Sequence, residues 1–434
     1  MIDVLKKLNP FSQKFILTDE HKLCLDYLEN SDQNLFISGK AGTGKTSLIH
    51  HFRSVTKKKV VVLAPTGIAA LNIKGQTIHS FFKFPPRMIE ASSIRRLSND
   101  RLYADIDCLV IDEISMVRAD ILDGIDRFLR LHGKDRNMPF GGVQIILVGD
   151  MYQLPPVVSR EEAEIFNRVY DSPYFFSAKS FDSLNILFIE LQTVFRQKEI
   201  EYVTMLNSVR TGKVDIKTLD LVNNRVKPEK VNDSYVILCT TNKVVEGINN
   251  NKLLAIHKPE FRYLAITEGV FPTEERHLPV ELELKLKVGS RVLFVKNDSE
   301  GQWVNGTTGT VEKLEEKLVV VKIDGSEKLV EVHKDSWENI RYSLDEKTGE
   351  IKSEVIGKLT QYPLKLAWAI TVHKSQGMSF DKVCLDFSKS PFTHGQTYVA
   401  LSRCRTLDGL ILTRKIYPND ILIDERITSF YRRL

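Results

Sequence analysis

The chain has 434 residues, a length that predicts two to four domains. Apolar residues make up 42% and charged residues 27% of the sequence, which is typical of a soluble globular protein with a large buried core. The net charge of +5 permits an anionic partner such as nucleic acid but does not demonstrate one. No apolar run approaches the roughly 18 residues that a transmembrane helix needs, so we expect no membrane partner.

The start of the chain and its cysteines bear on the compartment. The first residues, MIDVLKKLNPFSQK, carry Lys and Pro where a signal peptide has its apolar stretch, which argues against export. Five cysteines lie far apart and form no C-x-x-C pair, so neither a zinc site nor a disulfide framework is predicted. We therefore expect a reducing, cytoplasmic setting, with nucleoid association if the chain is bacterial.

Buried parallel strands are predicted first. Four runs have apolar residues on both faces and end at Gly, Pro or an acidic residue, where an α/β sheet places its chemistry: 34–39, 58–65, 108–113 and 143–150. Helical segments separate them. Similar runs return later in the chain, at 185–191, 235–240, 382–387 and 410–415. The sequence therefore predicts two parallel α/β sheets.

Two segments interrupt this alternation of predicted strands and helices. Residues 258–358 contain short runs typical of antiparallel strands, with turns at Asn305-Gly306, Gly309 and Asp324-Gly325, and predict a small β-barrel inserted into the second α/β domain. Residues 345–350 predict a further hairpin tip, and an excursion at 77–105 interrupts the first sheet. The predicted domains are a first α/β domain at 1–180 and a second one at 181–257 and 359–434.

A phosphate-binding loop is predicted at 39–46. There GKAGTGKT matches G-x-x-x-x-G-K-[ST], directly after a strand and before a helical segment. The glycines let backbone N–H groups face the phosphates, and the helix adds its positive end. Lys45 should reach the β- and γ-phosphates, and Thr46 should bind Mg²⁺. The other candidate nucleotide contacts in this loop are Gly39, Ala41, Gly42, Thr43 and Gly44.

Two carboxylates stand at the end of the predicted strand run 108–113. Asp112 can hold Mg²⁺ through water, and Glu113 can polarise the attacking water. After the next strand, Gln153 can contact a γ-phosphate and report its presence, although Asp150 and Gln153 can also simply cap a turn. This order of motifs predicts hydrolysis of a nucleoside triphosphate coupled to a γ-phosphate sensor.

Two arginines in the second half suit the same reaction. Arg196 and Arg403 each lie near the end of an α/β element, and a guanidinium suits the charge that builds on a transferring phosphoryl group. If the two α/β domains face each other across the nucleotide, both arginines enter the site when the cleft closes. The alternative is that they are ordinary surface arginines.

Motifs in a fixed order cover nearly the whole chain: GKAGTGKT, LAPTGIAA, TIHSFF, VIDEISMV, PFGGVQIILVGDMYQLPPV, VFRQ, TVHKSQGMSFD and YVALSRC. They resemble the motif series of superfamily-one DNA helicases and are most similar to those of the petite-integration-frequency (PIF-type) helicases, as a minimal bacterial or phage-like core. The resemblance implies two RecA-like P-loop NTPase domains, a strand-separating wedge at 77–105 and an SH3-like barrel insertion.

The resemblance also implies an activity. It predicts ATP- and Mg²⁺-dependent 5′-to-3′ translocation on single-stranded DNA by a monomeric core. The expected substrates are 5′-tailed duplexes, G-quadruplexes and DNA–RNA hybrids, in DNA repair, recombination, replication or telomere-like maintenance. An RNA helicase and a nucleotide-switched DNA-binding or remodelling ATPase without unwinding stay open as alternatives. A small-molecule kinase is disfavoured because the second α/β domain repeats the first.

Residue roles follow from the same resemblance. The nucleotide-site positions are Lys45, Thr46, Asp112, Glu113, Gln153, Arg196 and Arg403, with Gly377 from the TVHKSQGMSFD motif. The positions that line the channel for the DNA strand are Pro65, Thr66, His79, Asn242, Thr371, His373 and Lys374. From the residues themselves, Phe81 and Lys83 combine aromatic and basic groups as base stacking requires, but packing of Phe81 within its own domain is equally open. His373 can likewise be a buried core histidine.

His21 departs from the family pattern. Relatives usually carry Gln at the adenine-reading position, where this chain has LTDEHKLCLDYL at 17–28. An amide matches the donor and acceptor edge of adenine, whereas an imidazole cannot offer both at once in that geometry. Adenine selectivity is therefore either relaxed or supplied by backbone groups, and we expect GTP to compete better here than in the relatives.

Overall fold

The first sheet of the computed structural model is fully parallel, in the order β3-β2-β4-β5-β1-β6. Residues 17–85, 87–90, 94–97, 101–197, 199–271, 278–344 and 351–434 are described. The strands are β1 (Leu35–Gly39), β2 (Val60–Ala64), β3 (Gln76–Thr77), β4 (Cys108–Ile111), β5 (Gln144–Gly149) and β6 (Leu187–Leu191). The first four predicted runs are confirmed as β1, β2, β4 and β5.

The placement of the run 185–191 in the second sheet is wrong. As β6, it pairs in parallel with β1, so that Ile189 lies beside Ile37. The first sheet therefore extends to Leu191, past the boundary predicted at 180. The reason is physical: an apolar run identifies a buried strand, but the choice of neighbour is a long-range pairing.

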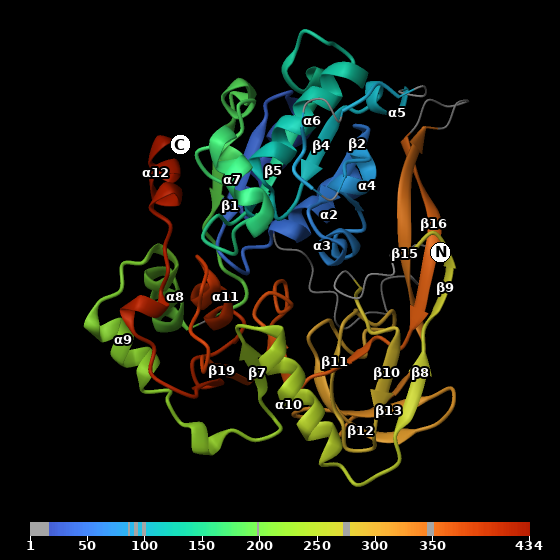
Figure 1. Cartoon of the computed structure of the whole chain (residues 1–434), viewed down its shortest axis with the longest axis vertical. Coiled ribbons are helices and arrows are strands. Elements are labelled where there is room, and N and C mark those ends of the chain that lie inside the picture. The colour runs from blue at the N-terminus through green and yellow to red at the C-terminus, as the bar shows by residue number, and fades with distance from the viewer. Residues whose placement is uncertain are drawn as a thin grey trace.

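Helices cover both faces of the first sheet because side chains of a strand alternate between the faces (Figure 1). On one face α1 (Asp19–Asn30) and α2 (Lys45–Val55) pack Leu28 and Phe52 against Ile37. On the other face α6 (Ala119–His132) packs Leu122 and Leu129 into the main core. The remaining helices of this part are α3 (Gly67–Asn72), α4 (Ile78–Phe82), α5 (Arg101–Ala104) and α7 (Arg160–Val169).

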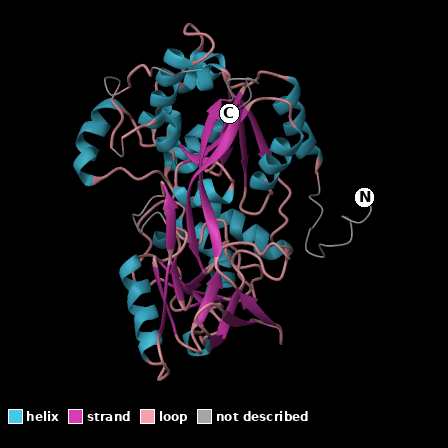
Figure 2. Ribbon diagram, turned by 90° about the vertical axis from the view of Figure 1, so that its right-hand side faces the viewer, coloured by secondary structure: helices cyan, strands magenta, loops and turns pink. Residues whose placement is uncertain are grey.

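The second parallel sheet has the order β18-β7-β19-β20, which confirms the second α/β prediction. Its strands are β7 (Val236–Cys239), β18 (Ala369–Thr371), β19 (Val383–Asp386) and β20 (Leu410–Leu412). Its helices are α8 (Ile200–Thr211), α9 (Ile216–Asn223), α10 (Asn242–Leu254) and α11 (Gln396–Leu401). Figure 2 shows the two α/β parts stacked along the long axis of the molecule. None of the described helices combines the length and the apolarity that crossing a bilayer requires.

The insertion forms two separate β structures. Barrel strands β11 (Arg291–Phe294), β12 (Thr308–Leu314), β13 (Val319–Ile323) and β14 (Leu329–Val332) arise from the predicted runs. They are joined by β17 (Leu364–Leu366), which lies beyond the predicted boundary at 358, while β8 (Phe261–Leu264) pairs with β10 (Glu283–Leu286). A second, three-stranded ribbon contains β9 (Ile266–Gly269), β15 (Asp335–Leu344) and β16 (Ile351–Gln361). The hairpin tip predicted at 345–350 lies outside the described residues.

Two elements of the second half reach back to the first domain (Figure 1). In the ribbon, Tyr342 Oη accepts a hydrogen bond from the Val62 N–H (3.3 Å). The C-terminal helix α12 (Glu425–Arg433) packs Phe430 among Phe36, Phe175 and Phe176. Assigning all of 359–434 to the second α/β domain is therefore wrong for α12, which completes the core of the first.

Candidate nucleotide site and strand channel

The phosphate loop joins β1 to α2 as predicted. Gly42 and Gly44 have φ values of 85° and 84°, a conformation that side chains with a Cβ rarely adopt. Lys45 Nζ donates to the carbonyls of Gly39 (2.5 Å) and Lys40 (3.0 Å), and it forms no salt bridge within the described residues. Burial lowers the pKa of Lys45, while the nearby charges of Asp150 and Glu113 oppose this shift. The ammonium group thus lies in the loop without a carboxylate partner, ready for an anion.

Two carboxylates follow β4. Asp112 is buried, and burial together with the charge of Glu113 raises the pKa of Asp112 to about 7. Burial also raises the pKa of Glu113, against the charges of Lys45 and Arg403. Glu113 has a φ of 51°, a conformation that costs a non-glycine residue free energy and that concentrates at functional sites.

The donor set fits a hard divalent cation. Carboxylate and hydroxyl oxygens are the ligands that Mg²⁺ prefers, and Asp112 and Thr46 supply them. In addition, Asp150 Oδ2 is buried and lacks a hydrogen-bond partner in the described part of the chain. Such an atom is costly to bury unless a cation or an ordered water satisfies it. Asp112 and Thr46 would hold the ion.

Gln153 lies in a tight loop after β5. Its N–H donates to the Asp150 carbonyl (2.9 Å), so the turn predicted as the alternative role is present, while the Gln153 side chain is almost fully buried. Gly395, just before α11, packs against this loop with a φ of 71°. A Cβ on Gly395 would lie 2.4 Å from the Tyr152 oxygen and 2.5 Å from the Gln153 oxygen. The sensor loop is therefore in direct contact with the second domain.

Arg403 is not a surface arginine, since it is only 1% exposed. Its Nη1 donates to the carbonyls of Ser375 (3.3 Å) and Met378 (3.1 Å), which bracket the turn at Gly377. Burial and the charge of Arg196 lower the pKa of Arg403 to about 9. Among the described residues, neither arginine forms a salt bridge with a carboxylate. The pair creates a positive site that an anionic γ-phosphoryl group would neutralise.

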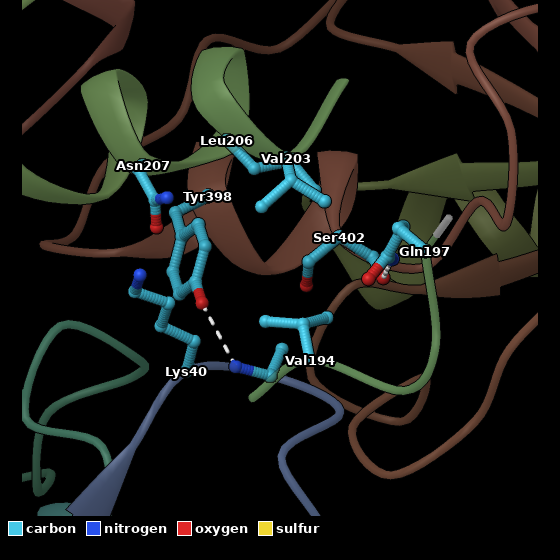
Figure 3. Close-up of a pocket in the computed structure, with 9 residues that line it drawn as sticks. Lys40, Val194, Gln197, Val203, Leu206, Asn207, Tyr398 and Ser402 are labelled. Atoms are coloured by element: carbon cyan, nitrogen blue, oxygen red, sulfur yellow. Dashed lines mark hydrogen bonds between the residues drawn. The ribbon is translucent and has the colours of Figure 1, made fainter. Parts of the chain in front are cut away.

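The two domains meet at the phosphate loop. The Ala41 N–H donates to Tyr398 Oη (3.0 Å), a contact between the loop and α11 of the second domain (Figure 3). Gln197 Nε2 donates to the carbonyls of Ser402 and Cys404, both at 3.0 Å. A pocket lies beside this contact, and Ala41 and Tyr398 both line it. Figure 3 shows that Val203, Leu206 and Asn207 of α8 line the same pocket. The candidate phosphate loop therefore lies at the contact between the two domains.

His21 contacts the phosphate loop and is 0% exposed. The Thr18 N–H donates to its Nδ1 (3.2 Å), which places the ring proton on Nε2, 3.2 Å from the Thr43 carbonyl. The ring also stacks on Phe195, with 6.1 Å between centroids. Burial lowers the pKa of His21, in agreement with a neutral ring. Both ring nitrogens thus serve the protein at the position expected to read adenine.

Most of the predicted channel residues follow strand ends. Thr66 caps α3 by accepting from the Ala69 N–H (3.3 Å), and Thr371, at the end of β18, accepts from the Lys374 N–H (3.2 Å). Pro65, His79 and His373 are half-buried, whereas Lys83, Asn242 and Lys374 are exposed. These residues lie on two sheets, so a nucleic-acid strand that contacts them all has to cross both domains.

The base-stacking role predicted for Phe81 is wrong in this arrangement. Its ring is 3% exposed and packs edge-on against Phe82, Tyr103 and Tyr342. Apolar packing of a large aromatic ring stabilises the domain more than solvent exposure would. The alternative, packing of the aromatic run within its own domain, is confirmed, with the ribbon adding Tyr342.

A small cavity of about 50 Å³ lies where α3, the barrel and the second sheet meet. Its lining includes Asn72, Trp337, Lys365 and Lys374. Burial and the charge of Lys374 lower the pKa of Lys365 to about 8. The sequence did not single out Lys365 because it lies on β17, outside every recognised motif; its position as a lone Lys among apolar strand residues was the only available signal.

Comparisons with known proteins establish the family. The family model for PIF1-like helicases matches residues 16–219. The ATP-dependent DNA helicase Pif1 of Campylobacter jejuni is 32% identical over 438 residues, covering 92% of this chain and 94% of that protein. The chain belongs to the Pif1 family of ATP-dependent DNA helicases. The human ATP-dependent DNA helicase PIF1 is also 32% identical, and 61% of its length is covered.

Solved structures of the Pif1 family confirm the two-domain fold. Bacteroides sp Pif1 in complex with ADP-AlF4 has a TM-score of 0.88 at 39% identity, covering 96% of this chain and 97% of that one. Bacteroides Pif1 bound to ssDNA matches over the same shares at the same identity, but with a TM-score of 0.69. As a whole, this chain is therefore more similar to the ADP-AlF4 complex than to the ssDNA complex, and unliganded Bacteroides sp Pif1 is nearly as similar, with a TM-score of 0.86.

Proposed function

We propose that the chain is an ATP- and Mg²⁺-dependent motor that moves 5′-to-3′ along single-stranded DNA and unwinds 5′-tailed duplexes. The observation that carries the proposal is that the charges of Lys45, Glu113, Arg196 and Arg403 lie close enough to act on one another where the two domains meet. Glu113 lies within electrostatic reach of both arginines. Such a site is complete only when the domains close on a nucleotide.

In hydrolysis, each residue has a distinct role. Glu113 accepts a proton from the attacking water, and its raised pKa favours that transfer. Lys45 binds the β- and γ-phosphates, while Arg196 and Arg403 stabilise the charge on the transferring phosphoryl group. Bound Mg²⁺, held by Thr46 and Asp112, supplies further charge neutralisation.

Translocation follows from the same contacts. Bound γ-phosphate favours the closed cleft and hydrolysis releases it, so each cycle moves the second sheet and the barrel relative to the first sheet. Channel residues lie on both sheets, for example Thr66 on the first and Thr371 on the second. A strand held by both is therefore drawn along as they move. Support for DNA as the track comes from relatives described as bound to ssDNA and at forked dsDNA.

The finer assignments belong to this proposal as well. We expect a monomer in solution, activity on G-quadruplex DNA, and association with nucleoid DNA in a bacterial host. Light scattering at the assay concentration tests the first expectation. A G-quadruplex with a 5′ tail, compared with a tailed duplex of equal length, tests the second.

The deciding experiment measures ATP hydrolysis and strand separation on duplexes with a 5′ tail, a 3′ tail or no tail. Glu113→Gln is the control. We expect unwinding of the 5′-tailed duplex alone, abolished in the variant. Hydrolysis stimulated by DNA without strand separation would instead support the nucleotide-switched remodelling ATPase, and stronger stimulation by RNA would support an RNA helicase. Hydrolysis that is indifferent to nucleic acid would overturn the proposal.

A further inference from the structure

The loop at 150–153, which carries Gln153, is held by side chains that no nucleotide-binding motif contains. They come from three separate segments that follow the first sheet in the chain: Arg210 of α8, His394 before α11 and Tyr431 of α12. Each contacts a different group of the loop. Together they connect the γ-phosphate sensor to elements that lie across the cleft or enter the first domain from the C-terminus.

Arg210 binds the carboxylate at the start of the loop. Its Nη2 and Nε lie 3.0 and 3.2 Å from Asp150 Oδ1, and Nη2 also lies 3.2 Å from Glu190 Oε1. The guanidinium stacks over Tyr152 at 4.6 Å from the ring centroid. Burial raises the pKa of Asp150, but the charges of Arg210 and Lys45 outweigh it and the net shift is downward. The ionised Asp150 thus pairs with Arg210 and lies within electrostatic reach of the phosphate-loop lysine.

Met151, the next residue, is held on both sides of its peptide backbone. Its N–H donates to Tyr431 Oη (3.4 Å), which also lies 2.7 Å from Ser38 Oγ at the end of β1. Its carbonyl lies 3.0 Å from His394 Nε2. The Asp424 N–H donates to His394 Nδ1, so the ring proton is on Nε2 and points at Met151. The Tyr431 ring stacks parallel to Tyr152 at 5.1 Å.

We propose that Arg210 is a positioning residue for ATP hydrolysis. Its ion pair with Asp150, with the contacts of His394 and Tyr431 to Met151, sets the position of Gln153 against the γ-phosphate. The proposal rests on the proposed ATPase function. A buried ion pair is a poor stabiliser compared with apolar packing, so stability alone does not account for it. Because α8 packs against α11 of the second domain, closure of the cleft moves this loop directly.

The test compares Arg210→Met with a matched control, Arg118→Met. Arg118 is also an inward-facing arginine, bound to Asp120 and Glu162, and its guanidinium lies 5.7 Å from the Phe166 ring centroid. Both variants lose two ion pairs and one aromatic contact, but only Arg210 contacts the sensor loop. Circular dichroism first establishes a temperature at which every variant is folded, and kcat and KM for ATP are then measured with saturating single-stranded DNA.

We expect Arg210→Met to lower kcat about 100-fold with little change in KM, because a shift of about 1 Å in a catalytic group costs that much. Arg210→Lys should recover part of the loss, since lysine keeps the positive charge but lacks the planar guanidinium that donates two hydrogen bonds to Asp150. Arg118→Met should lower the melting temperature and leave kcat unchanged. Tyr431→Phe keeps the ring but removes the acceptor for the Met151 N–H, and should lower kcat less than Arg210→Met does.

Asp150→Asn and the double variant show whether Arg210 acts through Asp150. If it does, the double variant is no slower than the slower single variant; multiplied losses would overturn the proposal. A kcat for Arg210→Met within about twofold of wild type would also overturn it. If Arg210→Met does not fold, unchanged kcat values in Arg210→Lys and Tyr431→Phe have the same meaning. Absence of DNA-stimulated hydrolysis in the wild-type chain would instead refute the proposed function.

Discussion

Replacing His21 by alanine separates two roles for this ring, reading adenine and holding the phosphate loop. The ring has no exposed surface, Nδ1 accepts from the Thr18 N–H, and Nε2 lies 3.2 Å from the Thr43 carbonyl. An edge that is already bound within the protein has little to offer a base. We therefore expect His21→Ala to impair turnover of ATP and GTP to the same degree.

The expected magnitude follows from the groups left behind. Removing the imidazole leaves the buried Thr43 carbonyl without this partner, which costs about 1–3 kcal/mol. At about 1.4 kcal/mol per factor of ten, kcat/KM should fall about 5- to 150-fold for either nucleotide. The substitution also removes the bond from the Thr18 N–H to the ring, while Thr18 Oγ1 still caps α1 by accepting from the backbone N–H of residue 21.

The assay measures kcat/KM for ATP and for GTP with single-stranded DNA present. His132→Ala is the matched control: His132 is 2% exposed and bonds the Leu97 N–H (2.9 Å) and the Phe128 carbonyl (2.8 Å), and its ring packs against Tyr103 and Phe128. It should lose stability without losing kcat/KM. A loss for ATP that spares GTP would refute the reasoning and assign adenine recognition to His21. In the wild type, GTP turnover far below ATP turnover would contradict the relaxed selectivity expected from the sequence.

Three further predictions concern hydrolysis, packing and pH. Glu113→Gln should still bind ATP, measured with a fluorescent analogue, but release phosphate about 10²- to 10⁴-fold more slowly. Gly395→Ala should lose at least about 1–2 kcal/mol of stability, because its φ is 71° and its Cβ would lie 2.4 Å from the Tyr152 oxygen; thermal unfolding measures this. The affinity for single-stranded DNA should fall as the pH rises through about 8, where the free chain loses the charge of Lys365. Lys365→Met should remove this pH dependence in fluorescence anisotropy.

Local sequence was sufficient for the nucleotide half of the site. The phosphate loop, the Asp112-Glu113 pair and the Gln153 turn each occupy a few consecutive residues at the end of a strand, so their spacing carries their geometry. The barrel strands were equally accessible, because turns such as Asp324-Gly325 mark where a hairpin reverses. Predictions that depend on what surrounds a side chain in the fold were less reliable. Phe81 lies near Lys83 in the sequence, which suggested a base-stacking site, but its ring is buried beneath the ribbon.

The sequence could not predict which distant segments pack together, and in this chain those contacts reach the candidate nucleotide site. A run such as 187–191 is a buried strand in either sheet, and only pairing with β1 decides which. The C-terminal helix is short and carries several charged residues, yet Phe430 enters the first-domain core and Tyr431 contacts Met151. Such contacts between distant segments are stable only in the assembled fold. The candidate ATP site of this chain therefore contacts residues far outside its motifs, and we expect substitutions in α8 or α12 to change hydrolysis although neither helix contains a nucleotide-binding motif.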